Sequence, residues 1–401
     1  MPSKNIPVFV PYFDQTEKEL IAETLDSGWV SQGPATATFE SLLAKCEKAS
    51  HAAATTSATT ALHVALLAMG VTKDHDVLVP SFTFVATANA VEYIGATAVL
   101  VDVNKETFNI DTDYLQTYIE QNYVNGVNKR TNKTLWGVIP VGLFGLLASM
   151  PQIAQICQRY GINALEDNAC SLGSSINNIH GGGFGYPSVL SFHARKSITT
   201  GEGGAIITND DTLAQKIREL RSHSASVSEI TRHLNHGFLM PEYNSLGYNY
   251  RLSDIQGAMG IGQMKKLDYM IEQKRKLAKR YDEIIAQELA WLIPQKTPTD
   301  YFHTYQSYVC RLDYHDIEKG TEIRTKIMAY LEEKGIGTRQ GTHAVHMLGY
   351  YRDKYGYQKE DLAGAYACDK LSIAIPMYVS LTEDDQDYVV EQLKKARELY
   401  A

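Results

Sequence analysis

The chain has 401 residues, of which 44% are hydrophobic and 21% charged, and its formal net charge is −8. This length exceeds one typical hydrophobic core, so we expect two domains, and the acidic balance argues against non-specific nucleic-acid binding. No apolar run approaches the roughly 20 residues that cross a bilayer, and the start, "MPSKNIPVFVPYF", lacks a signal-type pattern, so we expect no membrane association.

Segments with strand and helix character alternate from about residue 50 to about residue 210. Helical spacing occurs in "ATTALHVALLAMG", "FVATANAVEYIG" and "SMPQIAQICQRYG", and strand-like runs are "DVLVP", "TAVLVDV", "WGVIPV", "INALED" and "PSVLSF". In the third helix Ser149 can cap, Pro151 lies in the first turn and Gly161 ends the helix. The alternation predicts a mainly parallel sheet covered on both faces, with ligands at the carboxyl ends of its strands.

The pattern changes near Ser253, where a long helical stretch begins. It is followed by strand-like "YQSYVCRL", helical "IRTKIMAYLEEKG" and the closing helical stretch "TEDDQDYVVEQLKKARELY". We expect these segments to form a smaller α+β domain, with the boundary inside the long helix. Residues 1–255 are predicted to be the large domain and residues 256–401 the small domain.

The cysteines are odd in number and scattered, and none stands at CxxC spacing. We therefore expect neither a disulfide framework nor a metal site, and a reducing cytoplasm fits best. The five positions are Cys46, Cys157, Cys170, Cys310 and Cys368.

Lys196 stands directly after a strand-like run, in "SFHARKSITTGEGG", and before a loop rich in Thr and Gly. Lysine is normally kept in water, because burying an unpaired ammonium is costly. A surface lysine at a strand end is one interpretation. The other is an amine that is held neutral or bound covalently to an aldehyde cofactor.

Asp167 ends another predicted strand, in "ALEDNACSLGSS". A carboxylate at this place can cap a helix or bind a metal, although no further ligand stands at metal-binding spacing. The presence of Lys196 suggests a third role for Asp167. An aspartate that faces the ring nitrogen of pyridoxal phosphate keeps that nitrogen protonated, so that the ring can accept electrons.

Two further segments suit a phosphate and a planar ring. Ser57, Ala58 and Thr59 precede a helix, whose first amides and positive dipole end favour a phosphate; ordinary capping is the alternative. Ser191 can add a hydroxyl to the same phosphate. Phe84, in "PSFTFVATANA", is either a core side chain or one that stacks on a cofactor ring.

Eight segments, in order, resemble the sugar aminotransferases of the DegT–StrS group, a branch of the fold type I pyridoxal phosphate enzymes. They are "SGWVSQGP", "TTSATTALHVAL", "VPSFTFVATANAV", "PVGLFG", "EDNACSLGS", "SFHARKSITTGEGG", "LGYNYRLSDIQGA" and "GIGTR". The resemblance spans nearly the whole chain. It implies an α/β fold like that of aspartate aminotransferase: a large domain with a mainly parallel, seven-stranded sheet covered by helices, and a smaller C-terminal α+β domain.

The resemblance also implies roles for single residues. Lys196 matches the lysine that binds pyridoxal phosphate covalently and then acts as a general base, and Asp167 matches the partner of the ring nitrogen. Phe84 matches the aromatic side chain that stacks on the ring. The positions that match phosphate contacts are Ala58, Thr59 and Ser191.

Other matched positions concern the partner subunit and the substrate. Asn249, in "GYNYR", matches an asparagine that reaches the phosphate of the neighbouring subunit's cofactor, which implies a homodimer with shared active sites. Arg251 belongs to the same crossing segment, and we expect it to bind substrate. His346 matches a recurrent histidine and is expected to contact substrate; for His343 and His346 the alternative is two polar residues in a linking loop.

The chain departs from the family's pattern at two of these segments. Cys170 stands where Gln or His is common and where the side chain approaches the cofactor's ring hydroxyl, a contact that a thiol makes more weakly. Gly142 stands where many members carry a histidine near the substrate.

The resemblance implies a transaminase for sugars destined for polysaccharides. It would move an amino group from an amino acid, with L-glutamate expected, to a keto group of a nucleotide-linked deoxysugar, with pyridoxamine 5'-phosphate as the intermediate carrier. Sugar dehydratases of the same family are the alternative, but they replace the lysine with histidine or add an iron–sulfur cluster; here Lys196 is present, with His193 nearby. A non-enzymatic regulator would need a DNA-binding segment, and the sequence shows no such pattern.

Overall fold

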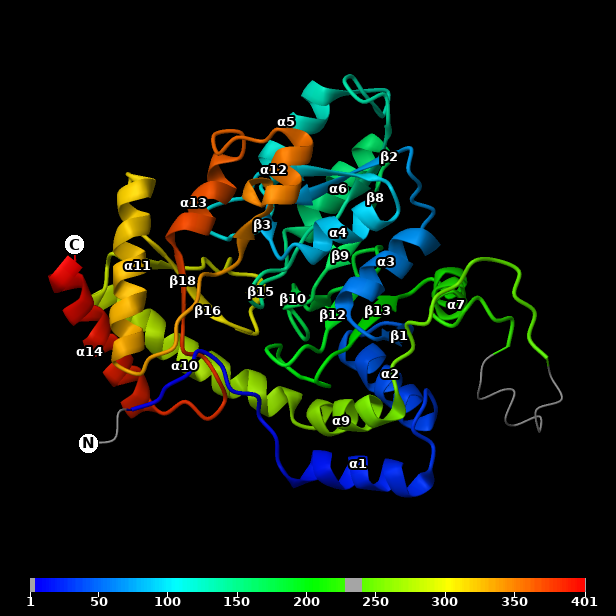
Figure 1. Ribbon diagram of the computed structural model, residues 1–401, viewed down its shortest axis with the longest axis horizontal. Coiled ribbons are helices and arrows are strands. Elements are labelled where there is room, and N and C mark those ends of the chain that lie inside the picture. The colour runs from blue at the N-terminus through cyan, green and yellow to red at the C-terminus, as the bar shows by residue number, and fades with distance from the viewer. Residues whose placement is uncertain (1–3, 228–239, 401) are drawn as a thin grey trace.

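The computed structural model describes residues 4–227 and 240–400, and a central sheet organises most of them (Figure 1). Its strands lie in the order β4 (Thr97–Val101), β2 (His75–Pro80), β7 (Thr134–Val138), β8 (Asn163–Ala164) with β9 (Glu166–Asp167), β12 (Ser188–Ser191), β13 (Gly204–Thr208) and β1 (His51–Thr55).

Strands β8 and β9 are consecutive segments that occupy one strand position, next to β7 and the residues that follow β7. The N–H of Leu165 donates to the Val138 carbonyl at 3.1 Å, and the N–H of Asp167 donates to the Pro140 carbonyl at 2.9 Å. Strand β13 is antiparallel to both of its neighbours, and the other pairs are parallel. Within the described residues the prediction of a mainly parallel, seven-stranded sheet is therefore confirmed.

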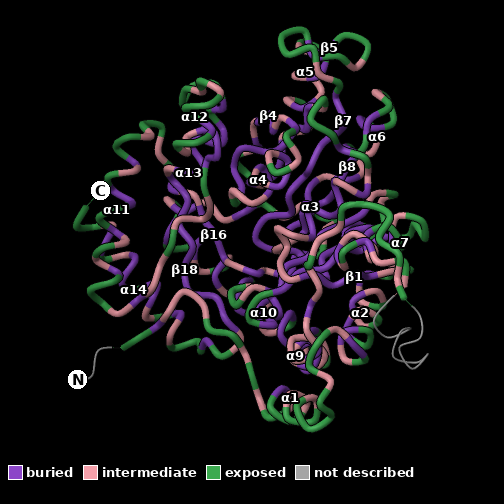
Figure 2. The backbone as a smooth tube through the Cα atoms, turned by 45° about the vertical axis from the view of Figure 1, so that its right-hand side comes forward, coloured by how far each residue is buried: buried purple, intermediate pink, exposed green. Residues whose placement is uncertain are grey.

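Helices cover both faces of this sheet, as β2 illustrates. Val77 and Val79 are buried in one core with α3 (Ala58–Ala68) and α4 (Ala86–Tyr93), whereas Leu78 is buried in another with α5 (Thr112–Asn122) and α6 (Met150–Tyr160). Successive strand residues point to opposite faces, so an uninterrupted apolar strand requires cover on both. Figure 2 shows the resulting buried interior beneath exposed outer helices.

Local sequence signals explain the ends of these helices. Ser57 caps α3, because its Oγ accepts from the Thr60 N–H at 3.1 Å. Helix α6 has Pro151 in its first turn and ends at Gly161, whose φ of 63° favours glycine. Ser149 was expected to cap α6, but its side chain makes no capping hydrogen bond; the Tyr301 hydroxyl donates to its Oγ at 3.2 Å instead.

The helical stretch from Ser253 is two helices, α9 (Asp254–Met264) and α10 (Leu267–Glu288), where a single long helix was expected. The break falls at Lys265 and Lys266. The Lys266 side chain contacts helix α1 (Gln15–Ser27). Its Nζ lies 2.6 Å from Oε1 of the buried Glu17. The break thus coincides with a contact between a lysine and a buried carboxylate.

The C-terminal part has a core of its own, which Leu277 and Tyr281 of α10 join. By contrast, α9 packs closely on α2 (Pro34–Cys46), where a Cβ at Gly260 would lie 2.7 Å from the Phe39 ring. The domain boundary between residues 255 and 256 stays a prediction. This boundary would place most of α9 in the small domain, although α9 packs on α2 of the large domain. Elements of the C-terminal core are β14 (Leu292–Pro294), β16 (Tyr308–Leu312), β18 (Ser372–Ile375), α11 (Ile317–Glu333) and α14 (Glu383–Tyr400).

Further elements connect these layers. They are β3 (Phe82–Thr83), β5 (Tyr123–Val124), β6 (Val127–Asn128), β10 (Ser175–Ile176), β11 (Ile179–His180), α7 (Asp211–Leu220), β15 (Tyr301–Phe302), β17 (His343–Ala344), the 3-10 helix η1 (Val345–Met347), α12 (Gly349–Tyr355) and α13 (Ala363–Leu371). None of the described helices is long and apolar enough to cross a membrane. Among residues 4–227 and 240–400, no three His, Cys, Asp or Glu side chains are grouped to hold a metal ion.

Candidate active site

Lys196 lies in the turn that follows β12, at the edge of the sheet where the parallel strands end. The side chain is half-buried, and its Nζ donates to Sγ of Cys170 at 3.0 Å. The residues after it are buried, with Ile198 only 1% exposed, so the turn is anchored in the core. The structure therefore directs this amine toward the end of β9 and away from open solvent.

Asp167 ends β9 and is 4% exposed. Its Oδ2 accepts from the Thr87 hydroxyl at 2.7 Å, and its Oδ1 accepts from the Ala169 N–H at 3.2 Å. Burial raises the pKa of this carboxyl, while the two hydrogen bonds and the charge of Lys196 act in the opposite direction. Asp167 caps none of the described helices, so capping does not account for it, and a buried carboxylate so held can pair with a protonated ring nitrogen.

Phe84 follows β3 and differs sharply from its neighbour Phe82. The Phe82 side chain is fully buried in the core, whereas Phe84 is 60% exposed. The N–H of Thr87 donates to the Phe84 carbonyl at 3.3 Å, and the same Thr87 holds Asp167. The core interpretation thus applies to Phe82. Phe84 has an exposed aromatic ring that suits stacking on a planar cofactor, and Thr87 connects its backbone to the buried carboxylate.

The N-terminus of α3 faces the end of β13. A Cβ at Gly204 would lie 2.5 Å from the Ala58 nitrogen, so only glycine allows this approach. Gly204 is paired with Ser191 of β12, which brings that serine to the same place. The first amides of a helix have no acceptor within it, and the residues Ala58 and Thr59 are half-buried here, which fits a phosphate.

These contacts connect the predicted site residues in one series. Thr87 connects Phe84 to Asp167, and Cys170, in the turn after Asp167, contacts Lys196. Strand β12, which precedes Lys196, pairs with Gly204, and Gly204 lies against the N-terminus of α3. The residues present therefore fit pyridoxal phosphate, with a buried carboxylate, an amine, an exposed ring and a helix N-terminus. Thr87 was missed from the sequence, because a single threonine in a helix carries no signal of a partner 80 positions away.

At Gly142 the structure leaves no room for the histidine that many family members carry. A Cβ there would lie 2.6 Å from Ser171 Oγ and 2.7 Å from Asn168 Oδ1. Ser171 Oγ in turn donates to the Gly142 carbonyl at 2.7 Å. The neighbouring Ser171 and Asn168 therefore fit the glycine that this chain has at position 142.

Asn249 and Arg251 lie along the end of β1, apart from the contacts around Lys196. Asn249 is exposed, and its backbone pairs with Ser222. Arg251 pairs through its backbone with Thr55, and its Nη1 donates to Ser222 Oγ at 3.2 Å. Among residues 4–227 and 240–400, no side-chain hydrogen bond or ion pair joins either residue to Lys196 or Asp167. Their roles toward a neighbouring subunit and a substrate stay predictions.

His346 was expected to contact substrate, and the structure does not place it at an accessible surface. Its side chain is fully buried, and its Nδ1 lies 2.7 Å from Ser81 Oγ. Burial lowers the pKa of this imidazole. Ser81 follows β2 directly, so His346 braces the strand end that leads to Phe84. His343, by contrast, is exposed and pairs through its backbone with Thr83.

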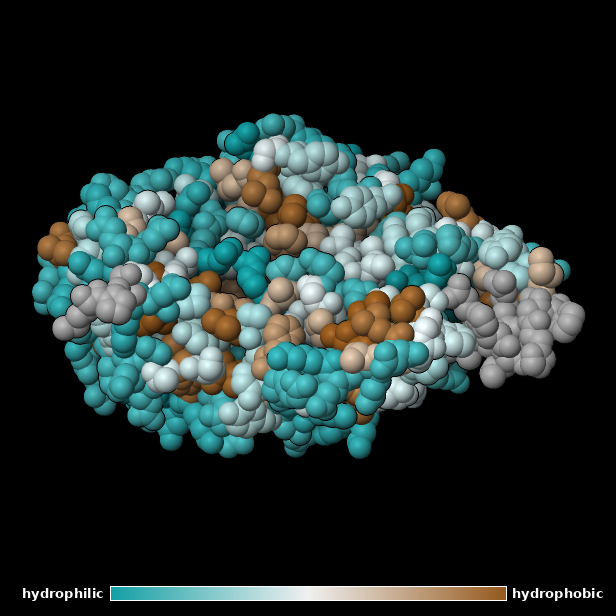
Figure 3. All heavy atoms as spheres, turned by 60° about the horizontal axis from the view of Figure 1, so that its bottom comes forward, coloured by the Kyte–Doolittle hydropathy of each residue, from teal (hydrophilic) through white to brown (hydrophobic). Residues whose placement is uncertain are grey.

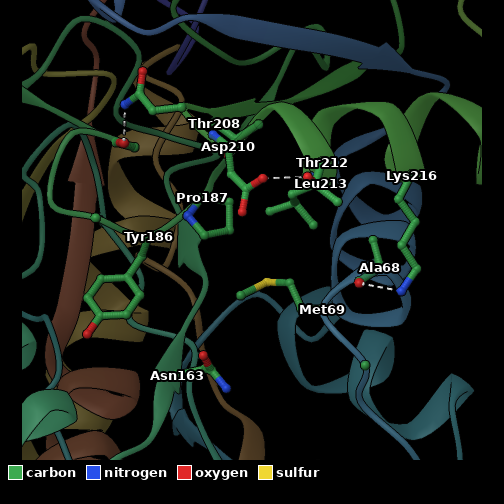
Figure 4. Close-up of a pocket in the computed structure, with 14 residues that line it drawn as sticks. Ala68, Met69, Asn163, Tyr186, Pro187, Thr208, Asp210, Thr212, Leu213 and Lys216 are labelled. Atoms are coloured by element: carbon green, nitrogen blue, oxygen red, sulfur yellow. Dashed lines mark hydrogen bonds between the residues drawn. The ribbon is translucent and has the colours of Figure 1, made fainter.

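A pocket of about 610 Å³ lies elsewhere, at the opposite ends of β12 and β13 (Figure 4). Its lining includes Pro187, Thr208 and Lys216, whose Nζ donates to the Ala68 carbonyl at 2.8 Å. None of the predicted site residues lines it. The chemistry of the candidate site does not involve this pocket.

Comparison with known proteins places this chain in a family. The model of the DegT/DnrJ/EryC1/StrS aminotransferase family matches residues 11–394. Spore coat polysaccharide biosynthesis protein SpsC of Bacillus subtilis is 33% identical over 389 residues, covering 97% of this chain and 96% of its own. GDP-perosamine synthase of Caulobacter vibrioides is 32% identical over 389 residues, covering 97% of each chain.

The fold is shared with solved structures as well. The putative sugar aminotransferase Spr1654 of Streptococcus pneumoniae, solved in its PMP form, superposes with a TM-score of 0.89 at 23% identity, covering 99% of this chain and 100% of that one. This likeness confirms the fold type I architecture. On the family match and the two relatives, the chain belongs to the DegT/DnrJ/EryC1/StrS aminotransferase family, as a pyridoxal phosphate-dependent sugar aminotransferase.

Proposed function

We propose that this chain moves the amino group of L-glutamate to a keto group of a nucleotide-linked deoxysugar, with Lys196 as the catalytic residue. The observation that carries the proposal is that the Lys196 amine, in contact with Cys170, and the buried Asp167 carboxylate lie at one sheet edge, with the α3 N-terminus at the same edge. Pyridoxal phosphate, when bound, supplies an aldehyde that takes up the amino group and a ring that accepts electrons.

Lys196 has two tasks in this scheme. Its Nζ would hold the cofactor covalently. As a free amine, the same Nζ would act as the general base that takes the proton from the donor's α-carbon. The anchored turn after β12 keeps the amine within reach for both tasks, because the flanking Ser197 and Ile198 are buried.

Asp167 supports the electron-accepting ring. Its carboxylate would pair with the protonated ring nitrogen, and Thr87 and Ala169 orient it by their hydrogen bonds. Phe84 would cover one face of the ring, and the amides of Ala58 and Thr59, together with Ser191, would bind the phosphate. Cys170 is proposed to lie near the ring hydroxyl, which its contact with Lys196 Nζ supports.

The nature of the acceptor is supported by the relatives. One is a GDP-perosamine synthase and another a spore coat polysaccharide biosynthesis protein, so a nucleotide-linked sugar destined for a polysaccharide is the natural acceptor class. All five cysteines are free thiols, which supports the reducing cytoplasm as the location of the reaction.

A homodimer with shared active sites is part of the proposal. Large apolar side chains are exposed in the segment that leads to Asn249: Met240 is 81% and Leu246 80% exposed. Figure 3 shows a face of the molecule on which apolar side chains gather among hydrophilic ones. Exposed apolar groups of this size are typical of protein contact surfaces. Arg251, in the same segment, is proposed to bind substrate across the dimer.

The test is a panel of nucleotide-linked 3-keto and 4-keto deoxysugars, incubated with the cofactor-loaded protein and L-glutamate and followed by mass spectrometry. Transfer of nitrogen to one of these sugars, absent in Lys196→Ala, supports the proposal. Loss of water from the sugar without nitrogen transfer would assign the chain to the dehydratases instead. No turnover of any keto sugar would contradict the proposed acceptor class.

A further inference from the structure

Two buried threonine hydroxyls form a series of contacts that ends at the Asp167 carboxylate. Thr83 belongs to β3 and Thr87 to the first turn of α4, and each is 1% exposed. Their Oγ1 atoms lie 3.2 Å apart, and Oγ1 of Thr87 lies 2.7 Å from Asp167 Oδ2. Among residues 4–227 and 240–400, the Thr83 hydroxyl has no hydrogen-bond partner other than Thr87. Thr83, Thr87 and Asp167 thus form one hydrogen-bond relay.

The distances indicate the direction of each hydrogen bond in this relay. The Thr87 hydroxyl has one proton and two acceptors in reach, the Asp167 carboxylate at 2.7 Å and the Phe84 carbonyl at 3.3 Å. A hydroxyl–carboxylate hydrogen bond is short, about 2.5–2.7 Å, and the Phe84 carbonyl already accepts from the Thr87 N–H. The proton therefore goes to Asp167, and Oγ1 of Thr87 accepts the proton of Thr83.

This direction favours the ionised form of Asp167. A carboxylate only accepts, and both of its oxygens do so here, because Oδ1 accepts from the Ala169 N–H at 3.2 Å. Burial raises the pKa of this carboxyl, and the hydrogen bond from Thr87 is the largest of the effects that oppose burial. The first turn of α4 adds to it, since a helix N-terminus attracts negative charge. Support for the Thr87 hydroxyl is therefore support for the charge of Asp167.

The C-terminal part of the chain holds the backbone of Thr83. Thr83 pairs with His343 of β17, and the N–H of Val345 donates to the Ser81 carbonyl at 2.7 Å. A side chain on a strand so paired, and 1% exposed, has little freedom to turn away. The Thr83 hydroxyl is thus a fixed donor to Thr87.

We propose that Thr83 is a positioning residue of the transamination, which acts through Thr87 to keep Asp167 ionised and its Oδ2 in a fixed direction. Hydrogen bonds in series polarise one another, so the Thr83 proton on Thr87 Oγ1 makes Thr87 a better donor to the carboxylate. This inference rests on the proposed role of Asp167 toward the ring nitrogen. The alternative is that Thr83 only fills space, in which case its shape matters and its hydroxyl does not.

The kinetic test is the donor half-reaction with L-glutamate in a single turnover of the cofactor-loaded protein. Thr83→Val removes the hydroxyl and keeps the shape, and it should lower the rate at saturation by about two- to tenfold, the range for one buried neutral hydrogen bond. Thr83→Ser keeps the hydroxyl and should keep the wild-type rate. An unchanged rate in Thr83→Val, or an equal loss in Thr83→Ser, would overturn the inference.

Thr321→Val is the matched control for the loss of a threonine hydroxyl. Thr321 lies in α11, and its hydroxyl donates to the Ile317 carbonyl at 2.7 Å, within the same helix. This variant should leave the rate of the donor half-reaction unchanged. A loss equal to that in Thr83→Val would mean that the rate responds to any such substitution, which would overturn the inference.

A double-mutant cycle tests whether Thr83 acts through Thr87. Thr87→Val removes the charge-assisted hydrogen bond to Asp167 and should lower the same rate by about tenfold or more. Adding Thr83→Val to Thr87→Val should lower the rate no further, because the Thr83 proton has then lost its acceptor. Losses that multiply in the double variant would show that the two threonines act independently and would overturn the inference.

A spectroscopic measurement separates the relay from catalysis. The nitrogen NMR signal of isotope-labelled pyridoxal phosphate in the loaded protein reports the protonation of the ring nitrogen. The wild-type protein and Thr83→Ser should show a protonated nitrogen. Thr83→Val should shift the signal toward the unprotonated position, and Thr87→Val should shift it further.

The outcomes of this measurement also distinguish the inference from the proposed function. A wild-type signal in Thr83→Val would overturn the inference and leave the role of Asp167 intact, whereas an unprotonated nitrogen in the wild-type protein would overturn both. If the signals shift as expected but no keto sugar receives nitrogen, the proposed acceptor fails while the relay stands.

Discussion

Nζ of Lys196 donates a hydrogen bond to Sγ of Cys170, and the two atoms lie 3.0 Å apart. Cys170 follows Asp167 by three residues, so the turn after β9 brings its thiol to the amine on which the proposed chemistry depends. A covalent bond between the amine and the cofactor would end this contact and cover the thiol. Cys170 therefore offers a direct report on the occupation of the site.

Cofactor loading should protect Cys170 from alkylation. In the cofactor-free protein, N-ethylmaleimide should label Cys170 faster than Cys46, which is also half-buried but whose pKa burial raises far above its usual range. After loading with pyridoxal phosphate, the labelling of Cys170 should fall and that of Cys46 should not, as peptide mass spectrometry would show. Equal labelling of Cys170 in both states would place the thiol outside the cofactor site.

Asp167→Asn should bind pyridoxal phosphate and turn over slowly, because a neutral amide no longer favours the protonated ring. A charge-assisted hydrogen bond contributes about 1.5–3 kcal/mol, so turnover should fall by about one to two decades. Asp353→Asn, an exposed aspartate of α12, serves as the control and should keep wild-type turnover. Unchanged turnover in Asp167→Asn would limit Asp167 to a structural role.

The stability of the fold should fall as the pH rises, because two carboxyls near the site are buried. Burial raises the pKa of Glu47 to about 8 and that of Glu166 to about 7, from an ordinary value of 4.5. Between these values the folded protein holds protons that the unfolded chain releases. The free energy of unfolding should therefore be highest below about pH 5 and decline up to about pH 8.

Urea unfolding at about pH 5.5 and about pH 8.5 checks this expectation. Glu47→Gln removes one of the two protons, so its free energy of unfolding should decline less than that of the wild-type protein. Glu332→Gln, at an exposed position of α11, should behave like the wild type. The same decline in Glu47→Gln and wild type would mean that Glu47 is ionised in the fold.

Much of the fold could be predicted because its signals are local. The Ser57 cap, the Gly161 helix end and the apolar strand runs each depend on a few neighbouring residues, and the strand ends place Asp167 and Lys196 at one edge. The break between α9 and α10 could not be found in this way. It coincides with the contact of Lys266 with Glu17, 249 positions away, which no local pattern records.

The surroundings of the matched positions depend on how distant segments pack. Lys196 and Asp167 belong to recognised motifs and lie at one edge of the sheet, and their roles stay predictions. His346 also matches a motif position, but its imidazole is buried at the end of β2, where it contacts the Ser81 hydroxyl. Burial of a histidine depends on how distant segments pack, so sequence alone did not distinguish a bracing residue from a substrate contact.

Shared active sites predict rescue between two inactive chains. Lys196→Ala and Asn249→Ala should each be severely impaired, and their heterodimer should regain up to about half the wild-type activity, because one of its two sites combines an intact Lys196 with the partner's intact Asn249. Each variant co-expressed with itself is the control. Verified heterodimers without recovery would place each site within a single chain.

The central claim is that Lys196 holds the cofactor, and borohydride reduction tests it most directly. Reduction of the loaded protein, followed by peptide mapping, should find the pyridoxyl group on Lys196, and Lys196→Ala should bind the cofactor without forming the adduct. Lys274 is the sharpest competitor, because burial lowers the pKa of its amine to about 8 and its Nζ has no hydrogen-bond partner among the described residues. A label on Lys274 or on any lysine other than Lys196 would contradict the account.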